Sequence, residues 1–249
     1  MSKNSQLQSN SESQWKSAYI LGGIAAILSL IAVVADIVIG SSTGGSNLTE
    51  LPQTAVERFL QFQQNPWLGL YNLDLLNTVV QLISVPVYFA LYGALRRAHQ
   101  PFALLALIIF MLGTAIFVAN NAALPMLELS QKYSLAAETQ KPLLAAAGEA
   151  LLVRGAHGSL GAFFSFFLPI LAGLIFSLVM FLGKIFGKVT ALVGSLGNLF
   201  MLAYVVLVTF APSVKTMAMA FAMPGGLLLI AWMILFTIRL FQLGTAKDS

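Results

Sequence analysis

The sequence predicts an all-α polytopic membrane protein: a bundle of six transmembrane helices with two long outer loops that carry short amphipathic helices. Of the 249 residues, 58% are hydrophobic and only 9% are charged, whereas soluble domains have about 45–50% and about 25%. The apolar residues gather in six runs of about 20 residues, which is the length that a helix needs to cross the hydrocarbon core of a membrane. These runs lack the alternation of polar and apolar residues that a membrane β-barrel requires.

The elements follow from these runs in order. Residues 1–17 are polar and predict a disordered cytoplasmic tail. Residues 18–243 form the predicted six-helix transmembrane domain, and residues 244–249 a second cytoplasmic tail. The first apolar run is too long for the core of a signal peptide, so it is expected to stay as a signal anchor. The expected spans are residues 18–39, 71–95, 102–124, 159–182, 189–211 and 225–243.

Two long loops, residues 40–70 and 125–158, separate the first two spans and the third and fourth. In the first loop, residues 55–62 predict an amphipathic helix whose apolar residues Val56, Phe59, Leu60 and Phe62 rest on the membrane surface. The second loop has leucines at helical spacing. Such helices either roof a cavity or simply connect spans along the interface, and the sequence leaves both interpretations open.

Lysine and arginine set the expected orientation. The short connection between the second and third spans holds Arg96 and Arg97, and the one between the fourth and fifth holds Lys184 and Lys188. Basic residues in tight loops favour the cytoplasmic side, so both termini are expected in the cytoplasm and both long loops outside.

Polar residues within the second span lie on one face. Asp74, Asn77, Gln81, Ser84 and Tyr88 follow one another at offsets of three and four residues, which places them along one side of a helix. Because polar groups are costly in lipid, this side is expected to face the interior of the bundle.

Other spans bring further polar residues to the bundle, most of them near its predicted outer end. We therefore predict a polar pocket that opens outward. Two alternatives remain: the amides act only as hydrogen bonds between helices, and Asp36 simply reaches the lipid headgroups. The candidate pocket residues are Asp36, Asp74, Asn77, Gln81, Ser84, Tyr88, Asn120, Asn121, His157 and Asn198.

No catalytic residue, cofactor site or metal site is predicted. The chain has no cysteine and two histidines, His99 and His157, which fall on opposite sides of the membrane in the predicted topology. Thiol chemistry and multi-histidine metal sites are thereby excluded, and the composition argues against nucleic-acid binding. An intramembrane enzyme using Asp36, Asp74 and His157 requires these three to meet within about 3–4 Å of one another or of a shared metal.

The favoured hypothesis is therefore a non-enzymatic protein of the lipid bilayer that binds a small amphiphile or a membrane partner protein in this pocket. The first alternative is a small transporter or permease subunit, which requires a continuous polar path to the cytoplasm. The intramembrane enzyme is the second alternative. The sequence does not predict an oligomeric state.

Several short motifs resemble the uncharacterised bacterial multi-pass membrane proteins that are grouped as a domain of unknown function. The resemblance covers about residues 65–243 and implies a multi-pass protein with about six helices in the inner (plasma) membrane of a bacterium or archaeon. It assigns no reaction and no catalytic residue. The motifs are Asn65–Pro66, LYGALRR at residues 91–97, Ala119–Asn120–Asn121, AAGEALL at residues 146–152, KIFGKVTA at residues 184–191 and GSLGN at residues 194–198.

Overall fold

The computed structural model describes residues 3–43 and 51–246, and within these it contains helices and no strand. The chain therefore has the all-helical fold that its composition predicts. The helices are α1 (Lys3–Thr43), α2 (Ala55–Gln64), α3 (Pro66–Tyr71), α4 (Leu75–Asn120), α5 (Ala123–Leu135), α6 (Lys141–Gly155), α7 (Phe163–Leu182), α8 (Lys188–Phe210), the 3₁₀ turn η1 (Pro212–Val214) and α9 (Lys215–Thr245).

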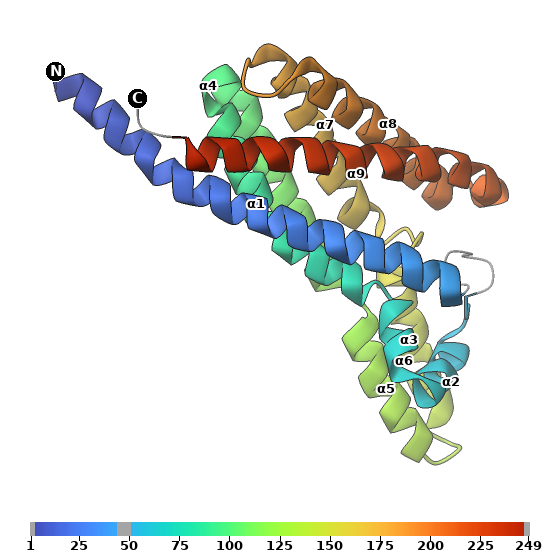
Figure 1. Cartoon of the computed structure of the whole chain (residues 1–249). Helices are drawn as coiled ribbons and strands as arrows, with labels where there is room; N and C mark the ends of the chain where they lie inside the picture. Colours follow the sequence, from blue (N-terminus) through green and yellow to red (C-terminus); the bar gives the residue numbers. More distant parts are fainter. Residues whose placement is uncertain (1–2, 44–50, 247–249) are drawn as a thin grey trace.

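Five long helices pack into a closed ring. α1 contacts α4, α4 contacts α7, α7 contacts α8, α8 contacts α9, and α9 returns to α1. Figure 1 shows these helices as an elongated bundle, with the two chain termini near one end and the short helices α2, α3, α5 and α6 at the other. We call these four short helices the cap.

The longest helix, α4, changes direction at His99, whose backbone is not helical (φ −158°, ψ 85°). Pro101 follows two residues later; it lacks the backbone donor of the helix, and its ring clashes with the carbonyl of the residue four positions earlier, which breaks or kinks a helix in this turn. Each half of α4 is long enough to cross a hydrocarbon core about 30 Å thick. The two halves correspond to the second and third predicted spans.

Five helices in the described part of the chain are long and apolar enough to span a membrane, and the segment containing α4 runs from Leu75 to Leu135. The protein is thus a multi-pass membrane protein by the length and composition of its helices. Because α4 contains two predicted spans, the arrangement is compatible with six crossings. The count of six itself stays a prediction.

The amino-terminal segment differs from the expected disordered tail, because α1 begins at Lys3. Trp15 explains part of this difference. Its ring stacks on Phe89 at 5.2 Å, and the guanidinium carbon of Arg96 lies 4.2 Å from the ring centre. These contacts hold the last turns of the polar segment against α4, so the helix of the first span extends toward the amino terminus. Residues 247–249 of the second expected tail lie outside the described residues.

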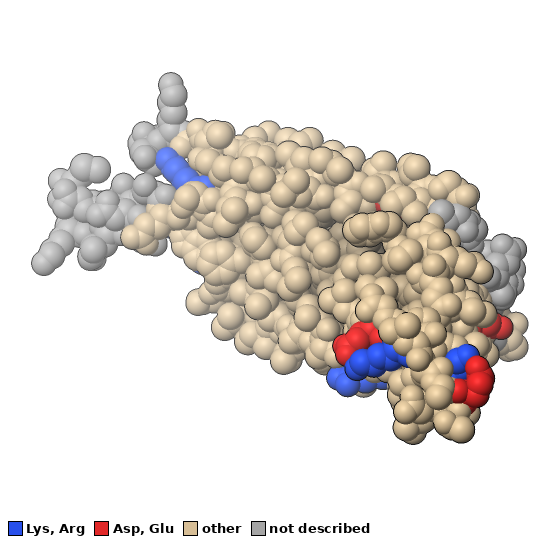
Figure 2. Space-filling model, turned by 90° about the horizontal axis from the view of Figure 1, so that it is seen from below, with Lys and Arg blue, Asp and Glu red and all other residues tan. Residues whose placement is uncertain are grey.

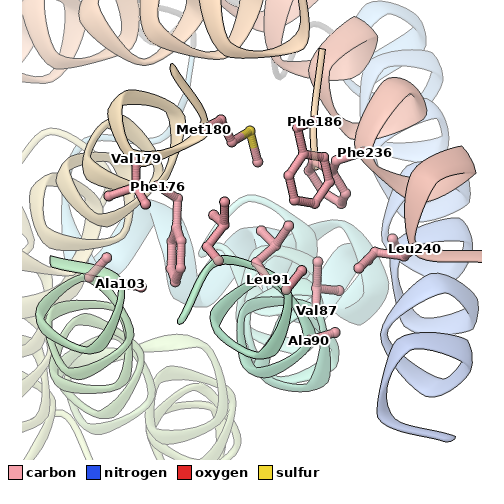
Figure 3. Close-up of a cluster of buried hydrophobic side chains, with 14 of the residues drawn as sticks. Val87, Ala90, Leu91, Ala103, Phe176, Val179, Met180, Phe186, Phe236 and Leu240 are labelled. Atoms are coloured by element: carbon pink, nitrogen blue, oxygen red, sulfur yellow. The ribbon is translucent and has the colours of Figure 1, made fainter. Parts of the chain in front are cut away.

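The core of the bundle is formed by side chains from all five long helices and from the loop after α7. Figure 3 shows Phe176 and Met180 of α7 facing Leu91 of α4, with Phe236 of α9 beside Phe186. All of these side chains are buried. The outer surface of the helices is apolar too, since residues such as Ile31 and Leu227 are more than 60% exposed. An apolar core inside an apolar surface is expected for a bundle whose solvent is lipid.

Most charged side chains on the face seen in Figure 2 gather over the cap, and the surface of the bundle is largely uncharged except for a basic side chain at the opposite end. Salt bridges in the cap include Lys132–Glu128 at 2.6 Å and Lys141–Glu138 at 2.5 Å. This distribution places the cap outside the apolar region of the molecule.

The cap has a small hydrophobic core of its own. Helix α2 starts with a capping box, in which the Thr54 hydroxyl accepts from Glu57 N–H and the Glu57 carboxylate accepts from Thr54 N–H. Its apolar face packs against α5 and α6. The expectation that Phe59 and Phe62 rest on the membrane surface is wrong, because both are buried in this core. Helices α3, α5 and α6 offer them an apolar surface that needs no lipid.

Candidate functional site

Asp74 forms the bend between α3 and α4. Its φ is 61° and its ψ is 27°, and it is the one described non-glycine residue with positive φ. This left-handed conformation costs most residues about 1–2 kcal/mol, and aspartate is among the few types that adopt it. The bend leaves the carboxylate at the first turn of α4. There Asn77 Nδ2 donates a hydrogen bond to Asp74 Oδ1 at 2.8 Å.

His157 connects three parts of the chain. Its Nδ1 lies 3.3 Å from Asp74 Oδ2, and its Nε2 lies 3.0 Å from the Tyr204 hydroxyl oxygen. An ionised carboxylate only accepts hydrogen bonds, so Nδ1 carries the proton on the Asp74 side. A neutral imidazole then accepts at Nε2 from the tyrosine O–H. The loop after α6 is thereby bound to the start of α4 and to α8.

The hydrogen bonds of His157 suit a structural role better than the role of a general base that removes a proton from a substrate. Both ring nitrogens of His157 already have partners, and the ring packs edge-on against Phe166 at 4.7 Å. A general base needs a nitrogen that can reach the substrate proton. The cluster is suited to fixing the position of the ring beside Asp74.

Tyr71 connects Asp36 with Asp74 through the backbone: its hydroxyl donates to the Asp36 carbonyl oxygen at 3.0 Å, and its own carbonyl accepts from Asp74 N–H at 3.0 Å. The described residues contain no group of three His, Cys, Asp or Glu side chains that could hold a metal ion. The shared metal of the enzyme alternative therefore has no such ligand group among the described residues.

The two asparagines at the end of α4 hold chain segments together. Asn120 Nδ2 donates to the Gly161 carbonyl at 3.1 Å, and Arg154 Nε donates to Asn120 Oδ1 at 2.9 Å. Asn121 Nδ2 donates to the Leu73 carbonyl at 2.9 Å. The space among these groups and Asp74 is about 10 Å³, about enough for one water molecule. In this part of the predicted pocket the amides form hydrogen bonds between chain segments, as the alternative interpretation expects, and leave almost no space for a ligand.

The polar residues along one face of α4 belong to two separate sites. Asp74 and Asn77 belong to the cluster with His157, whereas Gln81, Ser84 and Tyr88 line a separate cavity of about 180 Å³ inside the ring of helices. Asn198 of α8 lines the same cavity. We call this space the bundle cavity. The candidate residues are thus brought together in two groups rather than in one pocket.

A second space, of about 70 Å³, lies between the cap and His157. We call it the cap pocket. Its polar wall includes Arg58 of α2 and Asn72 at the end of α3. Arg58 Nε and Asn72 Oδ1 are buried and have no hydrogen-bond partner in the described part of the protein. The lining residues are Leu51, Pro52, Gln53, Arg58, Asn72, Leu152, Ala156 and His157.

Arg58 is the residue that sequence reasoning missed. It is only 5% exposed. Burial lowers the pKa of its guanidinium to about 10, while the carboxylates of Asp74 and Glu57 favour the charged form, so it stays charged at neutral pH. Its position carried a signal, because Ala55, Arg58, Phe59 and Phe62 share one face of α2 and all four are buried. A charge on the apolar face of a short helix is costly unless that face borders a polar space.

Comparison with known proteins places the chain in a family. The model of DUF4386, a domain of unknown function, matches residues 17–239. No curated protein and no solved structure matches the chain. Since the match runs from α1 through most of α9, it includes both the ring of helices and the cap. The chain therefore belongs to the DUF4386 family of unknown function.

Proposed function

We propose that this membrane protein binds a small amphiphile with an anionic head in the cap pocket. The observation that carries the proposal is the buried guanidinium of Arg58: the residue lines this pocket, and its Nε has no hydrogen-bond partner among the described residues. An unpaired buried cation is costly. An oxyanion beside Arg58 would supply the missing acceptor through a charge-assisted hydrogen bond.

The carboxylate of Asp74 supports an anionic rather than a cationic ligand. It already accepts a hydrogen bond from Asn77 and faces His157 Nδ1, so both of its oxygens have partners within the cluster. Arg58 Nη1 donates a long hydrogen bond to Gln61 Oε1, at 3.4 Å, and its Nε has no partner among the described residues. The cation is the less satisfied of the two charges.

The rest of the pocket fits the apolar part of a small ligand. Leu51, Pro52 and Leu152 face the same space as Arg58. A volume of about 70 Å³ exceeds the about 10–15 Å³ that a cavity needs to hold one water molecule. It therefore suits a carboxylate or phosphate head with its first carbon atoms, and a longer chain must continue through the rim.

Titration calorimetry on the full chain in lipid nanodiscs tests this proposal, with hexanoate, hexyl phosphate and hexan-1-ol as probes. We expect saturable binding of at least one anionic probe and none of the alcohol. Arg58→Gln should weaken binding at least tenfold, whereas Arg58→Lys should retain part of it. The two anions distinguish a carboxylate head from a phosphate head.

Lys132→Gln is the matched control, because it removes an equal charge from an exposed site of the cap and should leave the affinity unchanged. Thermal unfolding of each variant shows whether the fold is kept. Failure of both anions to bind, or equal affinity of wild type and Arg58→Gln, would rule the proposal out.

The transporter alternative has less support. It needs a polar path that continues from the cluster around His157 through the bundle. Beyond Tyr88, the cavity is lined chiefly by side chains such as Phe110, Leu229 and Phe236. The partner-protein alternative would be favoured if neither hexanoate nor hexyl phosphate bound to the cap pocket and a membrane protein bound to the wild type but not to Arg58→Gln.

A further inference from the structure

We propose a second binding site, in the bundle cavity, for a small neutral molecule that is mostly apolar and carries one hydrogen-bonding group, such as a phenol or an alcohol. This site is independent of the cap pocket. It lies inside the ring of helices, and its ligand class follows from the walls of the cavity.

All five long helices contribute to the cavity, which has a volume of about 180 Å³. A dry cavity of about 150 Å³ in a soluble protein is large enough to hold benzene, so this space suits a single aromatic ring with a substituent. The walls are Val33, Val80, Gln81, Ser84, Val87, Tyr88, Phe110, Pro169, Ile170, Asn198, Leu229, Trp232, Met233 and Phe236.

The ligand should be neutral. None of the lining residues is acidic or basic. A charge at this depth would be separated from water without a partner, which costs several kcal/mol. The cavity therefore discriminates against the anions that suit the cap pocket.

The ligand should also carry a hydrogen-bonding group. In the part of the chain that the structure describes, Trp232 Nε1 is buried without a partner. Asn198 is 2% exposed, and its Nδ2 donates to the Gly194 carbonyl at 2.7 Å. Gln81 and Tyr88 add an amide and a hydroxyl to the same wall. Within a membrane an unpaired polar group is expensive, so a ligand hydroxyl that pairs with Gln81 or Tyr88 on this wall gains affinity.

The walls are built to keep this shape. The Tyr88 ring stacks on Phe110 with 3.6 Å between ring centres and meets Phe176 edge-on. A Cβ at position 173 would lie 2.4 Å from Asn198 Oδ1, and one at position 194 would lie 2.5 Å from Trp232 Nε1. Glycine at both positions is what lets these two polar side chains occupy the cavity wall.

Fluorine NMR on the purified full chain in nanodiscs tests the site, with 4-fluorophenol and fluorobenzene as probes. We expect saturable binding of both probes above the background of protein-free nanodiscs, with the phenol bound more tightly. Val33→Phe fills the cavity from α1 and should weaken both probes at least tenfold. Gln81→Leu and Tyr88→Phe should reduce the preference for the phenol and leave fluorobenzene nearly unaffected.

Val34→Phe is the matched control, because Val34 is the next residue on α1, is 52% exposed and does not line the cavity. The Val34→Phe variant should bind both probes as the wild type does. Arg58→Gln should do so too, which would show that this site is distinct from the cap pocket. The proposal is overturned if neither probe saturates, if Val33→Phe binds like Val34→Phe, or if Gln81→Leu and Tyr88→Phe both keep the full preference for phenol.

Discussion

Asp74 combines two demands on a single side chain. Its backbone makes the left-handed bend that starts α4, and its carboxylate faces His157 and Asn77. Glycine would meet the first demand alone and glutamate the second. Aspartate meets both because its short side chain tolerates the left-handed region. The residue thus links the path of the backbone to the polar cluster.

Substitutions of Asp74 distinguish the contribution of its left-handed backbone conformation from the contribution of its negative charge. Asp74→Asn keeps a residue that tolerates positive φ but removes the charge that faces His157. Asp74→Ala removes the charge and adds strain of about 1–2 kcal/mol. We expect the thermal unfolding temperature in one detergent to decrease from wild type to Asp74→Asn and further to Asp74→Ala.

Asp74→Gly completes this series, because it removes the charge without the strain. It should lie above Asp74→Ala even though glycine loses more backbone entropy on folding. Equal unfolding temperatures for the alanine and asparagine variants would contradict a role of the backbone conformation.

At this scale the sequence located Asp74 and His157 through their predicted depth, and the structure places them 3.3 Å apart. The sequence analysis missed Arg58, because the outer loop that contains this residue was expected to lie on the membrane surface. A charged side chain in that position needs no explanation. Only the packing of α2 onto α5 and α6 makes that charge buried. The 3.0 Å contact of Tyr204 with His157 likewise depends on how α8 lies beside the loop after α6.

At the scale of elements, the close approach of α1 and α4 depends on a small residue. A Cβ at position 22 would lie 2.3 Å from Ala90 Cβ and 3.0 Å from the Pro86 carbonyl oxygen. In membranes, where lipid weakens the hydrophobic drive between helices, such contacts supply much of the association. Gly22 therefore sets the distance between these two helices.

Gly22→Ala should destabilise the protein by about 1–3 kcal/mol, the usual cost of overpacking. Gly187→Ala is the control, because a Cβ at that position meets nothing within 4 Å and should leave stability nearly unchanged. Reversible unfolding in mixed micelles measures both. A Gly22→Ala variant as stable as Gly187→Ala would show that the two helices can separate without cost.

At the scale of the whole molecule, the membrane orientation is still a proposal from the basic residues. The chain lacks cysteine, so single cysteines can report it. Thr139 lies in the turn between α5 and α6 and Gly187 in the loop between α7 and α8, and both are exposed. We expect a membrane-impermeant maleimide to label Thr139→Cys in intact bacterial cells and Gly187→Cys only after lysis.

The reverse labelling pattern would place the termini outside. Labelling of both positions in intact cells would contradict a topology in which the cap and the α7–α8 loop lie on opposite sides of the membrane. The cysteine-free parent chain is the background for each measurement.

The composition and the length of the apolar runs determined that the protein is an all-helical membrane bundle, because any segment that crosses lipid must satisfy its backbone hydrogen bonds internally. The spacing of polar residues on α4 determined that one face turns inward. The tertiary structure decided that these residues serve two spaces, since α7, α8 and α9 close around Gln81 and Tyr88 while the cap closes over Asp74. It also decided that Arg58 is buried, because burial depends on contacts between helices far apart in the chain, and no local pattern specifies them.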